Sequence, residues 1–284
     1  MTRFDSDDRD QIDNHLSDGV PAVTTDEVHT VPAGTPADID TACGNYDVVI
    51  CQQGATYSGD TTITVPNETK VFAHGATVDY SGTGEAVNLK GGAGQNPRPR
   101  PMWFGGTISG NPDADAGVVV RDTFGSVTRD VEIEAFDGSG AGRGDGYVVE
   151  NVDSWSELSA LHDFAIADCN RAIAFRPVDV TGGSGTGSFK GTHISNGHIE
   201  GCQGGYGIFF DGAVYDSHIH SIGANLADDA TLISCGGGMG DSVVENINGE
   251  AQGSTGITVI ELRSFGGVPP AISNVNCGGA AEHL

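Results

Sequence analysis

The sequence has few lysines, no long apolar run and no closely paired cysteines, and each shortage argues against a class of protein. Three lysines among 13 cations, against 39 acidic residues, leave no basic stripe for binding nucleic acid. Without a run of 18 apolar residues, no transmembrane helix is predicted. None of the six cysteines belongs to a CxxC pair, which argues against a cysteine zinc cluster.

The N-terminal segment also lacks the features of an export signal. Residues 1–20, MTRFDSDDRDQIDNHLSDGV, contain neither an apolar core segment nor twin arginines. We expect residues 1–30 to form a polar leader that attaches the chain to other proteins.

Acidic residues are spread along the whole chain. The formal net charge is −26, from 27 aspartates and 12 glutamates against ten arginines and three lysines. This balance resembles that of proteins from extreme halophiles, where salt at 1 M screens charge repulsion beyond about 3 Å. An ordinary acidic protein is the alternative interpretation.

Glycine is abundant, and two phrases alternate between glycine-rich turns. Glycine makes up 44 of 284 residues, about twice its usual share of roughly 7%. The first phrase, as in IADC and IEGC, starts at Ile133, Ile166, Ile199, Ile219, Val244 and Ile272. The second, a small residue followed by an apolar run, starts at Gly117, Gly146, Ala172, Gly207, Ala230 and Gly256.

This alternation predicts the fold class. Short runs repeating every 20 to 35 residues, with no helical periodicity between them, are typical of a solenoid. We therefore predict an all-β, single-stranded, right-handed parallel β-helix. Its first coils are assigned to residues 31–90, a Pro/Gly-rich loop and connecting coil to 91–116, and the main β-helix to 117–284.

Stacking of successive coils predicts which residues lie together in the core. Equivalent residues in such a fold stand about 4.8 Å apart. We expect Cys169 to lie directly over Cys202, and Ile166, Ile199 and Ile219 to share a neighbouring inward column.

The coil periodicity, the glycine-rich turns and the segment from Val31 to Gly82 resemble the pectin-lyase-like superfamily of right-handed parallel β-helices. The resemblance covers the chain from about Val31 onward. It implies the fold, and it implies a function among polysaccharide lyases, glycoside hydrolases and viral tail spikes. The catalytic motifs of that superfamily are not recognisable in this sequence.

One group of outward residues is a candidate ligand or metal site. Strand alternation places His198, Glu200, His218, His220 and Glu245 on one face of three neighbouring coils. Imidazoles and carboxylates can bind a divalent metal, here calcium or magnesium, or transfer protons. No cofactor is required by the pattern, and a solvated polar face is the alternative.

A second outward group has alternating charge. Arg176 lies between Glu150 and Asp211 in the predicted register. The three residues predict either a salt-bridge ladder across strands or the catalytic set of a lyase or glycosidase, because sugar chemistry uses paired carboxylates and a strong base.

An apolar stripe runs beside these charges. Val119, Val148, Phe209 and Leu232 are predicted to point outward, and exposed apolar stripes mark contact surfaces. Either a loop of the same chain or a neighbouring subunit should cover them, and we predict subunit contacts in a homotrimer.

Two functions follow from these features. The first is a virion structural protein of a haloarchaeal virus, a spike, turret or tail-fibre component. It would contact other virion proteins through its N-terminus and a host surface glycan or protein at its side, without nucleic acid or membrane partners. The alternative is a carbohydrate-active enzyme, a polysaccharide lyase or glycoside hydrolase. The predicted location is the virion, with the cell exterior or surface as the alternative.

Overall fold

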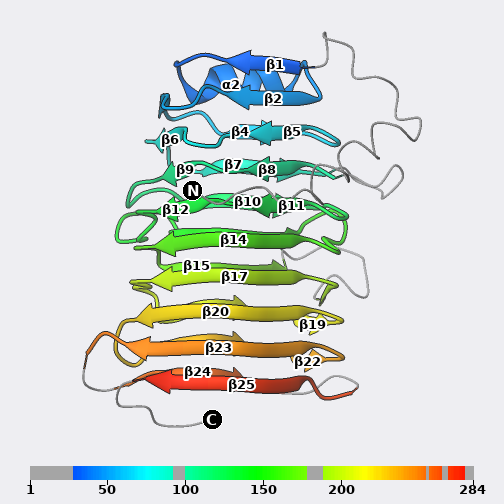
Figure 1. The fold of residues 1–284 in the computed structure, drawn as a ribbon, viewed down its shortest axis with the longest axis vertical. Helices are drawn as coiled ribbons and strands as arrows, with labels where there is room; N and C mark the ends of the chain where they lie inside the picture. Colours follow the sequence, from blue (N-terminus) through cyan, green and yellow to red (C-terminus); the bar gives the residue numbers. More distant parts are fainter. Residues whose placement is uncertain (1–27, 92–99, 178–187, 254–255, 264–267, 279–284) are drawn as a thin grey trace, which may run out of the picture.

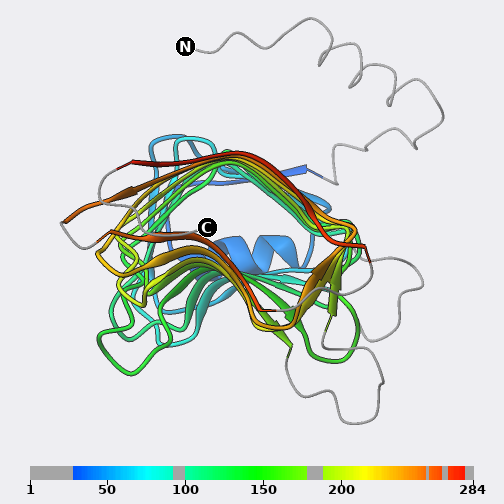
Figure 2. The same ribbon diagram turned by 90° about the horizontal axis from the view of Figure 1, so that it is seen from below.

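The computed structural model describes residues 28–91, 100–177, 188–253, 256–263 and 268–278. Residues 1–27 of the predicted leader and 92–99 of the predicted loop lie outside these ranges. The described chain winds as a right-handed parallel β-helix, as predicted, with its coils stacked along the long axis (Figure 1). Seen along the stack, the coils superimpose around one continuous interior (Figure 2).

Three parallel sheets, called A, B and C below, form the walls of the described solenoid. Sheet A contains β1 (Val28–Val31), β2 (Val48–Cys51), β3 (Thr56–Gly59), β5 (Lys70–Phe72), β6 (Thr77–Tyr80), β8 (Met102–Phe104), β9 (Thr107–Ser109), β11 (Val127–Arg129), β12 (Glu132–Glu134), β14 (Ala160–Ala167), β17 (His193–Glu200), β20 (His218–Leu226), β23 (Val243–Ala251) and β25 (Ala271–Gly278). Sheet B contains β4 (Ile63–Val65), β7 (Glu85–Lys90), β10 (Ala116–Arg121), β13 (Asp145–Asn151), β15 (Arg171–Pro177), β18 (Tyr206–Phe210), β21 (Thr231–Cys235) and β24 (Thr258–Leu262). Sheet C contains β16 (Ser188–Lys190), β19 (Ala213–Tyr215) and β22 (Met239–Gly240).

Sheet A begins as two ladders of short strands that merge at β14. The ladder ending in β11 and the ladder ending in β12 both pair with β14, and each later coil has one long strand. Every long strand bends at a residue with positive φ, namely Asp163, Asn196, Ser221, Asn246 and Asn274. Asp and Asn adopt this conformation more readily than most residues. Asn196 Nδ2 donates to Asp163 Oδ1 at 3.2 Å, so the bends also pair from coil to coil.

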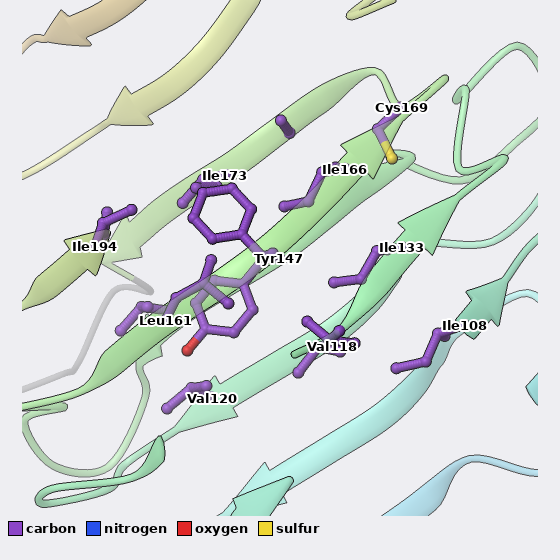
Figure 3. Packing of buried hydrophobic residues seen from close by; sticks show 14 of the residues in the cluster. Ile108, Val118, Val120, Ile133, Tyr147, Leu161, Ile166, Cys169, Ile173 and Ile194 are labelled. Atoms are coloured by element: carbon purple, nitrogen blue, oxygen red, sulfur yellow. The ribbon is translucent and has the colours of Figure 1, made fainter. Parts of the chain in front are cut away.

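The core is filled by stacked inward columns, and part of the predicted register is confirmed. Ile133 partners Ile166, which partners Ile199 (Figure 3 shows the first two). Cys169 and Cys202 follow in the same register, and both are fully buried. Burial raises the pKa of the Cys169 thiol, and the Cys202 thiol raises it further, as expected for stacked core residues.

The predicted position of Ile219 is wrong by part of a coil. Ile219 partners Ile194, and the partner of Ile199 is Ala224. All these side chains point inward, but Ile219 belongs to the first half of its strand, before the bend. The 20-residue interval between Ile199 and Ile219 therefore joins two different columns.

A short helix, α2 (Pro36–Cys43), lies in a segment that the sequence reading assigned to coils. Proline occupies its first turn, and the Thr35 N–H donates to Asp38 Oδ2 at 2.8 Å, which satisfies a group at the helix start. Ile39 is fully buried, so the helix covers the first coils of the core (Figure 1). No helix among the described residues has the length and apolar character needed to cross a membrane.

Candidate functional site

Four of the nine histidines gather on the outward face of sheet A. His162 lies on β14, His193 on β17, and His218 and His220 on β20. In the observed register, His193 partners His218, while Ser195 lies between His162 and His220. Because alternate residues of these strands fill the core, the four imidazoles share the opposite face. We call these four histidines, together with Glu245 on β23, the histidine patch.

The rings of the patch touch one another. His193 Nε2 lies 2.9 Å from His220 Nε2. The His193 and His218 rings are stacked, with centroids 5.2 Å apart, and the His162 ring meets His193 edge-on at 4.7 Å. One ring nitrogen from each of His193, His218 and His220 lies within 4.8 Å of the other two.

Neighbouring polar groups fix the orientation of these rings. Glu245 Oε1 lies 3.0 Å from His218 Nε2. The Ser221 hydroxyl lies 3.2 Å from His220 Nδ1, which leaves the Nε2 of that ring facing His193. Each contact restrains one nitrogen of a ring and directs the other one.

Partial burial shapes the charge of the patch. Burial lowers the pKa of His162, His193 and His220, and neighbouring imidazoles lower each of them further. The cause is the cost of placing positive charges side by side in a poorly hydrated place. These imidazoles are therefore neutral near pH 7, the form that binds a metal or accepts a proton.

The structure brings together three of the five residues predicted for this site. His218, His220 and Glu245 belong to the patch. His198 and Glu200 lie beyond the bend of β17, where they pair with each other at 3.8 Å and are 58% and 52% exposed. The bend separates the two halves of each long strand, so one outward face becomes two.

Sequence reasoning missed two members of the patch, on β14 and β17. The missing signal is a ladder of buried residues, Thr192, Ser217 and Ser242, spaced 25 residues apart. The Thr192 N–H donates to Ser217 Oγ, and the Ser217 N–H to Ser242 Oγ, each at 3.1 Å. Aligning THIS, SHIH and SVVE on these residues places His193 beside His218.

The donor set restricts the chemistry. Three imidazole nitrogens suit zinc, copper, iron or nickel. Calcium and magnesium prefer shells of oxygen ligands, so the predicted calcium or magnesium ion matches this set poorly. Neutral imidazoles beside a carboxylate can also transfer protons.

The second predicted set lies on the outward face of sheet B. Arg176 Nη1 donates to Glu150 Oε1 at 3.2 Å, and Arg176 Nη2 pairs with Asp145. Arg121 pairs with the other oxygen of Glu150 at 2.8 Å. Asp211, the third member, is exposed, and its backbone N–H continues the ladder from β15.

Burial indicates a structural role for this ion network. Arg176 and Glu150 are each 5% exposed, and Asp145 is not exposed at all. Burial lowers the pKa of Arg176 to about 10, so its side chain stays charged at neutral pH. Groups this inaccessible are poorly placed to touch a polymer, so the geometry favours the predicted salt-bridge ladder over the catalytic set.

The predicted apolar stripe is not an exposed surface. Val119 and Val148 are buried within the single chain, in a small cluster with Ala116 and Ala174. Arg176 contacts residues on both sides of Val148 along β13, so its side chain spans that valine.

Two further members of the stripe also differ from expectation. Leu232 points into the main core and is fully buried, and the register partner of Phe209 is Ser234, not Leu232. Phe209 is half-buried beside the Arg171 guanidinium, 5.3 Å from its ring centroid. The apolar stripe therefore does not support the homotrimer, which stays a prediction.

The fold and the site together define a parallel β-helix with a histidine patch on one wall. No family model matches the sequence, and no curated protein matches it. A solved structure that is similar is the crystal structure of alginate lyase from Paenibacillus sp. str. FPU-7. It shares 12% identity, with 89% of this chain and 99% of that chain covered and a TM-score of 0.34. Nothing about the site or reaction of this chain follows from a likeness at that level.

Proposed function

We propose that the protein is a carbohydrate-active β-helix whose active surface is the histidine patch on sheet A. The observation that carries the proposal is the gathering of His162, His193, His218 and His220 beside Glu245. Half-exposed polar contacts contribute little to the stability of a fold that rests on its core and backbone ladders. Clusters of ionisable groups with altered pKa values are typical of functional sites.

The shape of the wall supports a linear polymer as substrate. Sheet A presents its outward side chains on successive strands about 4.8 Å apart, so an extended chain of sugars can meet a similar row of polar groups at each step. Imidazole, amide, hydroxyl and carboxylate groups are suitable hydrogen-bond partners for sugar hydroxyls. The fold alone does not choose a reaction, so the proposal depends on the patch.

Proton transfer at a sugar is the reaction class that suits these groups. In a lyase, a base removes the proton beside a uronate carboxylate, the bond to the neighbouring sugar oxygen breaks, and that oxygen takes up a proton. In a hydrolase, a base takes a proton from water, whose oxygen attacks the sugar while an acid protonates the leaving oxygen. Both reactions need a basic and an acidic group near each other, which adjacent imidazoles and Glu245 supply.

The test is an incubation of the full chain with a panel of acidic and neutral polysaccharides in high salt. New reducing ends indicate hydrolysis, and ultraviolet absorption by unsaturated uronates indicates elimination. His218→Ala should lower the rate at least about 100-fold, whereas His198→Ala, on the same wall but outside the patch, should leave it unchanged. Equal rates in the two variants, or no product from any polysaccharide, would refute the proposed activity.

A virion spike, turret or tail-fibre protein of a haloarchaeal virus is the second candidate. The net charge of −26 with three lysines favours a protein that works in high salt. In this role the patch binds a host glycan without cleaving it, and the leader contacts other virion proteins. Glycan binding that His218→Ala abolishes, without any product, would favour this candidate over the enzyme.

A further inference from the structure

We propose that His193, His218 and His220 form a binding site for one first-row transition metal ion, with zinc as the first candidate. The inference rests on the same patch as the proposed function, but it depends on the geometry of the three rings and is tested without a carbohydrate. Either proposal can therefore fail alone.

The spacing of the ring nitrogens fits one shared ion. Two nitrogens bound to the same zinc at about 2.1 Å stand roughly 3.0 to 3.4 Å apart. The Nε2 atoms of His193 and His220 are 2.9 Å apart, and a nitrogen of His218 completes a group within 4.8 Å. The His193 and His220 nitrogens already have nearly this spacing, and the His218 ring has to rotate toward them to bring its nitrogen to the same ion.

The protonation of the facing rings supports the same conclusion. A neutral imidazole carries one N–H and one lone pair. When His220 Nδ1 donates to the Ser221 hydroxyl, its Nε2 presents a lone pair toward His193. The 2.9 Å contact is then a hydrogen bond donated by His193 Nε2–H. A shift of His193 to its Nδ1–H tautomer frees a second lone pair, and one cation can bind both nitrogens.

Contacts outside the three rings resemble the supporting shell of a metal site. Histidines that bind a metal commonly donate their other N–H to a carboxylate or another polar group, which fixes the ring and raises its basicity. Glu245 is placed to accept this bond from His218, and Ser221 to accept it from His220. Glu245 therefore acts here as a positioning residue.

The strands hold the three ligands rigidly. His193 and His218 are direct register partners on neighbouring strands, and His218 and His220 are alternate residues of β20. Hydrogen-bonded strands on both sides of β20 fix this arrangement. A site built on such strands is more precise than one built on loops.

The ligand count suggests a reactive rather than a structural site. A zinc ion held by three imidazoles keeps a fourth position open, as in catalytic zinc sites. At that position the metal would bind water or a sugar oxygen and polarise it. Hard cations such as calcium and magnesium are disfavoured, because the ring nitrogens are softer ligands than oxygen.

The experiment is calorimetric titration of the full, chelator-treated chain with zinc in 1 M sodium chloride, which screens weak binding to surface carboxylates. We expect one ion per chain, at least a tenfold loss of affinity in His193→Ala and in His220→Ala, and no change in His198→Ala. A loss of about 10- to 100-fold is expected in Glu245→Gln, the typical effect of removing a group that supports a metal ligand. Circular dichroism of each variant shows whether it is folded. If His220→Ala is unfolded, His220→Gln takes its place in the titration.

Cobalt(II) provides a second readout, because its visible absorption reports coordination by ring nitrogens, and it should be lost in the same variants. The proposal is overturned if the wild-type chain binds no zinc. It is equally overturned if His198→Ala loses as much affinity as His193→Ala, or if equimolar calcium displaces the zinc.

Discussion

The outward faces of sheets A and B carry ionisable side chains on neighbouring coils, yet the two faces differ in burial. On sheet B, Arg176 and Glu150 are almost completely buried, and each is neutralised by a partner of opposite charge. On sheet A, His193 and His220 are half-buried, and their nearest polar neighbour is another imidazole. Strand alternation decides which side chains point outward. Burial and partner charge then decide whether they stabilise the fold or remain available for chemistry.

The largest effect should come from breaking the network on sheet B. Arg176→Ala leaves Glu150 and Asp145 buried without their cation and should lower the free energy of unfolding by about 3–5 kcal/mol. The matched control is Arg129→Ala, because Arg129 is half-exposed in its pair with Asp163 and should contribute less than about 1 kcal/mol. Urea unfolding at fixed salt measures both. A loss below 1 kcal/mol for Arg176→Ala would show that its network is hydrated.

Substitutions in the histidine patch should have little effect on stability but a large effect on metal binding. His193→Ala and His220→Ala remove half-buried side chains that do not belong to the core, and each should change the free energy of unfolding by less than about 1 kcal/mol, measured in urea with a chelator present. The same substitutions should remove zinc binding. A loss as large as that of Arg176→Ala would mean that the patch, too, is part of the scaffold.

Acidification should have the smallest effect on the free energy of unfolding, and that effect should come from the histidines on sheet A. The pKa values of His162, His193 and His220 are lowered on folding, so the unfolded chain binds more protons than the folded chain below the ordinary value of about 6.5. Stability should therefore fall as the pH drops from 7.5 through 6.5 to 5, without added metal. Urea unfolding across this range should show a smaller fall in His193→Ala than in His198→Ala. An equal fall in stability in the two variants would contradict the conclusion that folding lowers the pKa of His193.

The fold was predictable because inward residues of the solenoid obey a simple repeat. Ile133, Ile166 and Ile199 lie at equal intervals of 33 residues, and the stack of Cys169 over Cys202 follows from the same spacing. Helix α2 was missed although Thr35-Pro36 is a recognisable helix start, because the surrounding segment was read as coils.

The site was only half predictable because the coils change length and bend. Both halves of a long strand carry isoleucine at inward positions, so Ile199 and Ile219 look equivalent although the bend at Asn196 separates their columns. Leu232 was misplaced for a related reason: the sequence repeat aligned it with Phe209, whose register partner is Ser234, two residues further along β21. Polar residues at fixed positions, such as Ser217 and Ser242, define the register better than apolar ones.

The even spacing of Thr192, Ser217 and Ser242 has a consequence for how such a surface can evolve. A stretch of 25 residues that starts and ends at this ladder forms one complete turn of the wall, so its in-frame loss or duplication keeps the strands above and below in register. Loss of residues 193–217 would set His162 next to His220 and delete one ligand, whereas duplication would add one. A single deletion or duplication can therefore change the number of histidines in the patch while the fold stays the same.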